Sequence, residues 1–177
     1  MKSAPFKLRI VAACVLVASA AAANAQGIYS TAGPWVDDAS RPVRLETLAG
    51  TYTVATMAYG ACQRVCSTTL RRIEELHDLA QERHLSLNFV VFGLDPAEDK
   101  PSDWANFRAD RHLAFADLQF LSGSAEATRR VANRLGVHYW RMDDHTLHDF
   151  RIVLLSPAGV VVRSINHYDD AIALLLP

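Results

Sequence analysis

Apolar and polar positions alternate with two different periods along the chain, and these periods predict strands and helices in turn. Residues 51–57 (TYTVATM) are rich in β-branched and aromatic side chains, which predicts a strand. Residues 67–83 carry leucine and isoleucine at helical spacing with charged residues between them, which predicts an amphipathic helix. Residues 85–94 (LSLNFVVFGL) are largely apolar, as expected for a central strand that is covered on both faces.

The alternation continues through the second half of the chain. The predicted elements are, in order, a helix over residues 101–110, a strand over 118–121, a helix over 124–135, a hairpin of strands at 151–155 and 159–165, and a closing helix over 168–176. Pro101 suits a first helical turn, while Ser124 and Gly136 suit the start and the end of the next helix. This order predicts one α/β domain with a central mixed sheet, helices on both faces and an additional β-hairpin.

The first residues have the three parts of a secretory signal peptide. A basic start without acidic residues precedes an apolar run over residues 10–23, and Ala23-Asn24-Ala25 is a small-x-small cleavage site. The apolar run is short for a membrane span, which needs about 20 residues. We therefore predict that residues 1–25 are removed and that the protein is exported, in a bacterium to the periplasm.

Two details complete the predicted organisation. Lipidation of Cys14, which ends a lipobox-like Val-Ala-Ala-Cys, is disfavoured because almost no apolar stretch separates it from the basic start. Residues 26–42 contain glycine and proline without a clear period and predict a loose N-terminal arm, so residues 43–177 are expected to form the domain. No second long apolar segment follows, and the mature chain is expected to have no integral membrane segment.

Composition and charge narrow the class of partner. The chain of 177 residues is 50% apolar and 21% charged, which is enough to bury a core. Its formal charge is −1, and without residues 1–25 there are 15 basic residues against 19 acidic ones. This balance argues against a strongly cationic binder of nucleic acid or anionic lipid.

The two remaining cysteines lie together in Cys62-Gln63-Arg64-Val65-Cys66, between the first predicted strand and the first predicted helix. A helix N-terminus and the cation Arg64 both favour thiolate. In an oxidising compartment the pair could be a structural disulfide, a redox couple or part of a metal site. Two thiolates are half of a zinc site, whereas two thiolates with one imidazole are a reasonable set for copper.

Candidate imidazoles come from seven histidines. His77, on the first helix, is expected to be a solvated surface residue. His145 and His148 lie just before the predicted hairpin, in a segment that could reach back toward the helix N-terminus. From the residues alone neither of the two is preferred.

Four features in order, spread over about residues 52–165, resemble the Sco/SenC family. They are the Cys-x-x-x-Cys after a strand, a strand that ends in Asp95-Pro96 with Asp99 and Pro101 close behind, the stretch Gly136-Val137-His138-Tyr139, and a histidine nine residues before a Pro-x-Gly turn, which is His148 before Pro157-Ala158-Gly159. The chain departs from the family pattern where prolines usually flank the cysteines, since Gln63 and Ser67 stand there, and where Arg64 replaces an acidic residue. Asp95 itself is expected to form a turn and cap.

The resemblance implies a thioredoxin-like copper chaperone linked to the assembly of cytochrome oxidase. The family's ligands map onto Cys62, Cys66 and His148 for one copper ion, as Cu(I) or Cu(II), with His145 as the fallback. The expected client is a protein such as an oxidase subunit that holds a copper centre. The alternative is a thiol–disulfide oxidoreductase that uses Cys62 and Cys66 as a redox pair on the cysteines of a partner.

Overall fold

The computed structural model describes residues 27–177 apart from positions 32, 61–64 and 144, and for residues 65–67 it describes the backbone. The strands are β1 (Trp35–Asp37), β2 (Pro42–Val43), β3 (Thr53–Ala58), β4 (Asn88–Gly93), β5 (Leu118–Gly123), β6 (Tyr139–Met142), β7 (His145–His148), β8 (Ile152–Leu155) and β9 (Val161–Ile165). The helices are α2 (Val65–Glu82), α3 (Pro101–Asp110) and α4 (Ala125–Leu135), with 3-10 turns η2 (Ile28–Ser30), η3 (Leu45–Leu48) and η4 (Ile172–Leu174).

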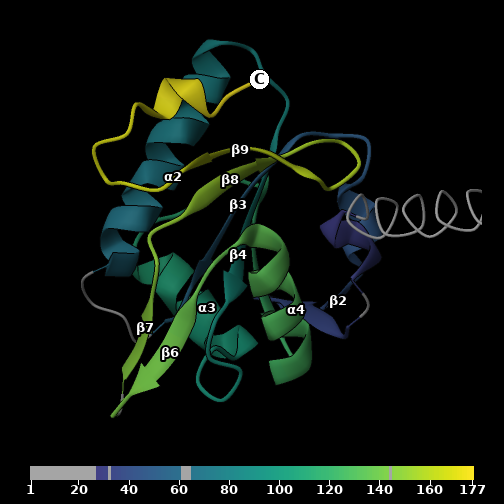
Figure 1. Ribbon diagram of the computed structural model, residues 1–177, viewed down its shortest axis with the longest axis vertical. Coiled ribbons are helices and arrows are strands. Elements are labelled where there is room, and N and C mark those ends of the chain that lie inside the picture. The colour runs from purple at the N-terminus through teal and green to yellow at the C-terminus, as the bar shows by residue number, and fades with distance from the viewer. Residues whose placement is uncertain (1–26, 32, 61–64, 144) are drawn as a thin grey trace, which may run out of the picture.

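A mixed sheet of seven described strands forms the centre of the domain, in the order β2-β1-β5-β4-β3-β8-β9 (Figure 1). β3, β4 and β5 are parallel to one another, and the hairpin β8–β9 adds antiparallel strands next to β3. β3 and β4 are almost completely buried, which explains why both read as continuous apolar runs. The predicted mixed sheet and hairpin are confirmed.

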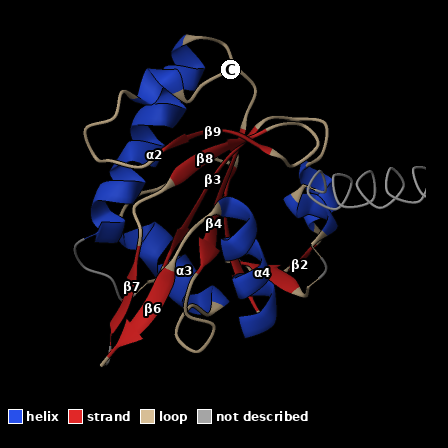
Figure 2. Cartoon of the chain, viewed as in Figure 1, coloured by secondary structure: helices blue, strands red, loops and turns tan. Residues whose placement is uncertain are grey.

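Helices cover both faces of this sheet (Figure 2). On one face, Trp104 of α3 stacks on Phe120 with ring centroids 5.0 Å apart, and His77 of α2 meets Phe89 at 5.4 Å. Successive strand residues point to opposite faces. α4 lies on the other face, where the Thr128 hydroxyl donates to the Gly93 carbonyl at 3.4 Å. The predicted layers are confirmed.

The residues that the sequence indicates as the start and the end of α4 have these roles in the structure. The Ser124 hydroxyl accepts a hydrogen bond from the Ala127 N–H at 3.2 Å, which caps the helix at its start. Gly136 ends it in the left-handed conformation, with φ of 70°.

The predicted closing helix over 168–176 is wrong. Only the single 3-10 turn η4 forms there, because the Asp170 carboxylate accepts the N–H groups of Asn166 and His167 and holds the preceding segment in a turn. Leu175 and Leu176 are buried, so the segment still packs into the core. Arg72 of α2 fastens it by donating to the Asp170 carbonyl at 2.6 Å.

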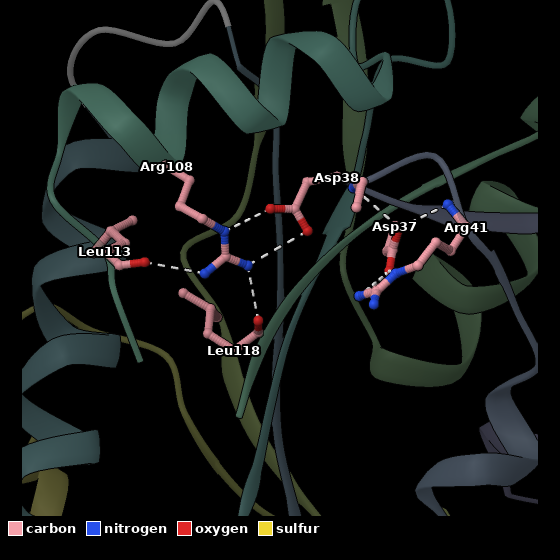
Figure 3. A network of polar contacts seen from close by, with 7 residues as sticks. Asp37, Asp38, Arg41, Arg108, Leu113 and Leu118 are labelled. Atoms are coloured by element: carbon pink, nitrogen blue, oxygen red, sulfur yellow. Dashed lines mark hydrogen bonds and ion pairs between the residues drawn. The ribbon is translucent and has the colours of Figure 1, made fainter. Parts of the chain in front are cut away.

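The N-terminal segment is also more regular than the loose arm expected over residues 26–42. β1 pairs antiparallel with β5, so Trp35, opposite Gly123, closes that side of the sheet. Figure 3 shows how Arg108 of α3 fixes this edge. Its guanidinium donates to the Asp38 carboxylate at 2.5 Å, to the Leu113 carbonyl at 3.0 Å and to the Leu118 carbonyl at 2.8 Å. The glycines and prolines concealed the two short strands β1 and β2, which tertiary pairing stabilises.

A second, two-stranded sheet was not predicted from the sequence. β6 and β7 form an antiparallel hairpin that pairs with no other described strand. It includes His145 and His148, for which the sequence pattern predicts no strand. Among the described residues, no helix is long and apolar enough to cross a bilayer.

Candidate functional site

The segment with the two cysteines joins β3 to α2. β3 and β4 are parallel and paired from Thr53 opposite Asn88 to Ala58 opposite Gly93, so their carboxyl ends meet at one edge of the sheet. Cys62 lies outside the described residues. The backbone of Cys66 lies in the first turn of α2, which begins at Val65. This edge of a parallel sheet, where strands lead into helix N-termini, is where α/β folds bind ligands.

The first turn of a helix is a position that favours the thiolate form of a cysteine. The unpaired N–H groups and the dipole at a helix N-terminus stabilise negative charge and lower the pKa of a thiol. No acidic residue lies in that first turn to oppose the effect. The position thus suits a cysteine that acts as a soft metal ligand or as a nucleophile.

Asp99 is a buried carboxylate directly beside this segment. Its side chain is 1% exposed, and it accepts hydrogen bonds from the N–H groups of Gly60 and Asp95, each at 2.7 Å. Gly93 leaves the space for it, since a Cβ at that position would lie 2.9 Å from the Asp99 Cβ. Asp99 therefore ties the end of β3 to the loop that follows β4.

Two effects oppose each other at Asp99. Burial raises its pKa to about 7, and the N–H groups of Gly60 and Asp95 reduce that rise because they favour the carboxylate. In the sequence, Asp99 could be recognised only as part of a motif. Its neighbours Glu98 and Lys100 are charged residues, both exposed in the structure, and they give no sign that Asp99 is buried. The available signal was its spacing of four residues after Asp95.

Asp95 acts as the turn and cap that the sequence indicated. Its Oδ1 accepts the Ala97 N–H at 3.2 Å, which closes the turn after β4. Its Oδ2 receives the Thr146 hydroxyl at 3.4 Å, so the same side chain contacts the β6–β7 hairpin.

His148 is the last residue of β7, and three residues separate it from Ile152, the first residue of β8. β8 pairs antiparallel with β3, with Ile152 opposite Thr56. The Thr56 hydroxyl donates to the Arg151 carbonyl at 2.8 Å, which holds the β7–β8 connection against β3. A short connection therefore joins His148 to the strand beside β3, and β3 is the strand that leads into the cysteine segment.

The hairpin also distinguishes the two candidate histidines. Side chains alternate between the faces of a strand, so His148 shares a face with Thr146, which contacts Asp95, whereas His145 lies on the opposite face. His145 is exposed and His148 is half-buried. The geometry favours His148 over His145 as the residue facing the end of β4.

The second ring nitrogen of His148 has a backbone partner. Its Nδ1 lies 2.8 Å from the Asp149 carbonyl oxygen, and a carbonyl can only accept, so Nδ1 carries a hydrogen and donates it. Histidines that bind metals commonly donate their other ring N–H in this way. Within the described part of the chain, no three His, Cys, Asp or Glu side chains form a possible metal cluster, but the Cys62 and Cys66 side chains are outside that part.

His77 differs from its expected place on the solvated surface. Its side chain is 16% exposed and stacks on Phe115 with ring centroids 4.2 Å apart. It is a packing residue between α2 and the sheet, and it lies about three helical turns after Val65, where α2 begins. Another histidine, His138, pairs with Asp149, with 2.7 Å between Nδ1 and Oδ2.

Comparison with known sequences identifies related proteins. The family model SCO1/SenC matches residues 23–175. A SCO1 protein homolog of Bacillus subtilis is 24% identical over 140 residues, which are 74% of this chain and 72% of that protein. Mitochondrial SCO2 of Saccharomyces cerevisiae is 22% identical over 158 residues, and the match covers 83% of this chain but 52% of that protein.

Solved structures share the fold. Arabidopsis thaliana ScoI, determined with copper bound, has a TM-score of 0.70 and 21% identity over 81% of this chain and 90% of its own. BsSco, described as a cytochrome c oxidase assembly protein with a disulfide switch, has a TM-score of 0.68 and 22% identity over 80% and 88% of the two chains. These likenesses confirm the expected thioredoxin-like fold of Sco type.

Proposed function

Since this chain belongs to the SCO1/SenC family, we propose that it binds one copper ion through Cys62, Cys66 and His148 and passes the ion to a partner protein by ligand exchange. Two thiolates and one imidazole are soft enough for Cu(I) and also suit Cu(II). In this proposal, copper is the cargo that the protein carries. The observation that carries the proposal is the placement of His148, which shares a face of β7 with Thr146 beside Asp95 and donates from Nδ1 to the Asp149 carbonyl, as metal-binding histidines commonly do.

The location and the recipient form the finer part of the proposal. The signal-peptide pattern over residues 1–25 supports export, to the periplasm in a bacterium. The related BsSco is described as an assembly protein of cytochrome c oxidase, which supports an oxidase subunit with a copper centre as the client. In this proposal the protein releases copper from Cys62 and Cys66 to ligands of that client.

Anaerobic titration of the reduced protein with copper tests the ligand set. We expect one copper per chain, with sulfur-to-copper charge-transfer bands for the cupric form. His148→Ala should weaken binding by about 10-fold or more and remove or shift those bands, while His145→Ala should bind like the unsubstituted protein. Loss of the site in His145→Ala alone would transfer the role to His145. No stoichiometric site in any form would overturn the proposal.

A thiol–disulfide exchange activity is the second candidate, and the place of Cys66 in the first turn of α2 favours it. One thiolate of the pair attacks a disulfide of the partner, the displaced partner sulfur leaves as a thiolate, and the second cysteine resolves the mixed disulfide. The partner gains two electrons and Cys62–Cys66 becomes the disulfide. His148→Ala separates the two functions, because it should weaken copper binding and leave the rate of exchange with a model disulfide nearly unchanged.

A further inference from the structure

A groove of about 570 Å³ lies between α4, the loop that follows β4, and strand β6. Arg129 of α4 and Pro96 of the loop form two of its sides, and Trp140 and Arg141 of β6 form a third. The groove lies next to the candidate copper site, and His148 is not among the described residues that line it. The two are joined by Asp95, which lines the groove and donates its N–H to Asp99.

Positive charge predominates in this groove. Arg129 is exposed, and the side chain of Arg141 is 64% exposed. Asp95 is the one carboxylate among the described residues that line the groove, and its side chain is 13% exposed, 3.7 Å from Arg141 and bonded to the Thr146 hydroxyl. The excess is local, because acidic residues outnumber basic ones in the chain beyond residue 25.

A large exposed apolar side chain, Trp140, also lines the groove, and a second, Met142, lies further along the same strand. Trp140 is 51% exposed and Met142 is 53% exposed, both on β6, whereas Trp35 and Trp104 are buried in the core. Aromatic residues, methionine and arginine are the side chains enriched where proteins bind one another. The sequence of β6, Tyr-Trp-Arg-Met, consists of such residues throughout.

We infer that this groove docks an acidic segment of a partner protein, with an apolar side chain of the segment seated against Trp140. Carboxylates on either side of that apolar residue would pair with Arg129 and Arg141, whose guanidinium groups can bind a carboxylate through two parallel hydrogen bonds. The inference rests on the proposed function for one point only, that the docked partner receives copper. Docking next to Asp95 would hold such a partner beside the candidate copper site.

The fluorescence of Trp140 provides the signal for the test, because Trp140 is the exposed tryptophan of the three in the chain. The probe is a short synthetic peptide with phenylalanine between aspartate and glutamate residues, added to the metal-free protein at low salt. We expect a saturable change in Trp140 fluorescence that weakens as salt is added. Arg129→Glu should weaken binding at least about 10-fold, and Arg141→Gln by a smaller factor, while Arg83→Glu, at an exposed position just after α2, should have no effect.

Three results would overturn the inference. They are no saturable change, equal binding of a peptide with lysine in place of the acidic residues, and binding that survives both Arg129→Glu and Arg141→Gln. A Trp140 blue shift with phosphatidylglycerol vesicles but not with the peptide would also reject it, in favour of a membrane surface. Copper titration of the same proteins distinguishes failures: peptide binding without a copper site refutes the proposed function alone, and a copper site without peptide binding refutes the docking groove alone.

Discussion

The backbone N–H of Gly60 donates to Oδ1 of Asp99 at 2.7 Å, although 39 residues separate the two along the chain. Gly60 is the last described residue before the cysteine segment, and the other oxygen of Asp99 accepts the N–H of Asp95. One buried carboxylate therefore joins the strand that leads to Cys62 to the loop beside the hairpin. Asp99 is not itself among the proposed copper ligands, but it fixes the backbone on which the cysteine segment begins.

Asp99→Asn is expected to disturb the candidate site. An amide can accept one of the two N–H groups but presents its NH₂ to the other, so two donors would face each other in a buried place. We expect a loss of about 1–3 kcal/mol in the free energy of unfolding and copper affinity lower by about 10-fold, as for groups that position metal ligands. Urea unfolding and copper competition with a chelator measure the two effects. Glu98→Gln, the exposed neighbour, is the matched control and should change neither.

Stability should depend on pH through the same carboxyl group. Its pKa is about 7 in the folded protein, because burial disfavours the charged form, against 3.8 as the ordinary value. Between these values the folded chain binds the extra proton, so this contribution to stability is complete below pH 3.8 and is lost as the pH rises through 7, with a slope of at most about 1.4 kcal/mol per pH unit. Urea unfolding from pH 4 to 8 should show this decline, and Asp99→Asn should flatten it. An identical slope in both proteins would refute the assignment.

Arg108→Lys is expected to loosen the N-terminal edge of the sheet. The lysine keeps the charge but cannot reach the Asp38 carboxylate and the carbonyls of Leu113 and Leu118 at once, as the guanidinium does. We expect the free energy of unfolding to fall by about 2–3 kcal/mol and hydrogen exchange in β1 to accelerate. Arg44→Lys, at an exposed position, is the control. Unchanged exchange in β1 would show that strand pairing alone holds this edge.

Much of the fold could be predicted because each central element carries a local signal. β3 and β4 are buried on both faces and read as apolar runs, and α4 has both a cap at Ser124 and a stop at Gly136. The elements that were missed depend on distant partners. β1 forms because it pairs with the backbone of β5. A 3-10 turn, η4, forms in place of the predicted helix because the Asp170 carboxylate accepts backbone N–H groups of the preceding residues.

The candidate site was predictable as a set of residue types and less so as an arrangement. The cysteine spacing and the turn residue Asp95 could be seen in the sequence, but the β6–β7 hairpin could not, because its four-residue strands have no long period. That hairpin is what separates the faces of His145 and His148. The burial of Asp99 was equally hidden, since it depends on Gly60, two residues after β3, and on Gly93, the last residue of β4.

Gly123→Ala tests the packing of the same edge from the side of β5. Trp35 lies opposite Gly123 in the β1–β5 ladder, and a Cβ on Gly123 would stand 2.5 Å from a carbon of the indole ring. The ring is buried and cannot move aside without disturbing Phe92, its neighbour at 5.1 Å. We expect a loss of about 1–3 kcal/mol in the free energy of unfolding, typical of overpacking.

A double-mutant cycle identifies the cause of that loss. Trp35→Leu removes the ring, so Gly123→Ala should cost at least about 1 kcal/mol less in that background than in the unsubstituted protein. Ser122→Ala is the control in the same strand, since the buried Ser122 hydroxyl meets no hydrogen-bond partner among the described residues and its removal should be nearly neutral. Equal costs in both backgrounds would mean that the strain arises in the β5 backbone and not at the indole ring.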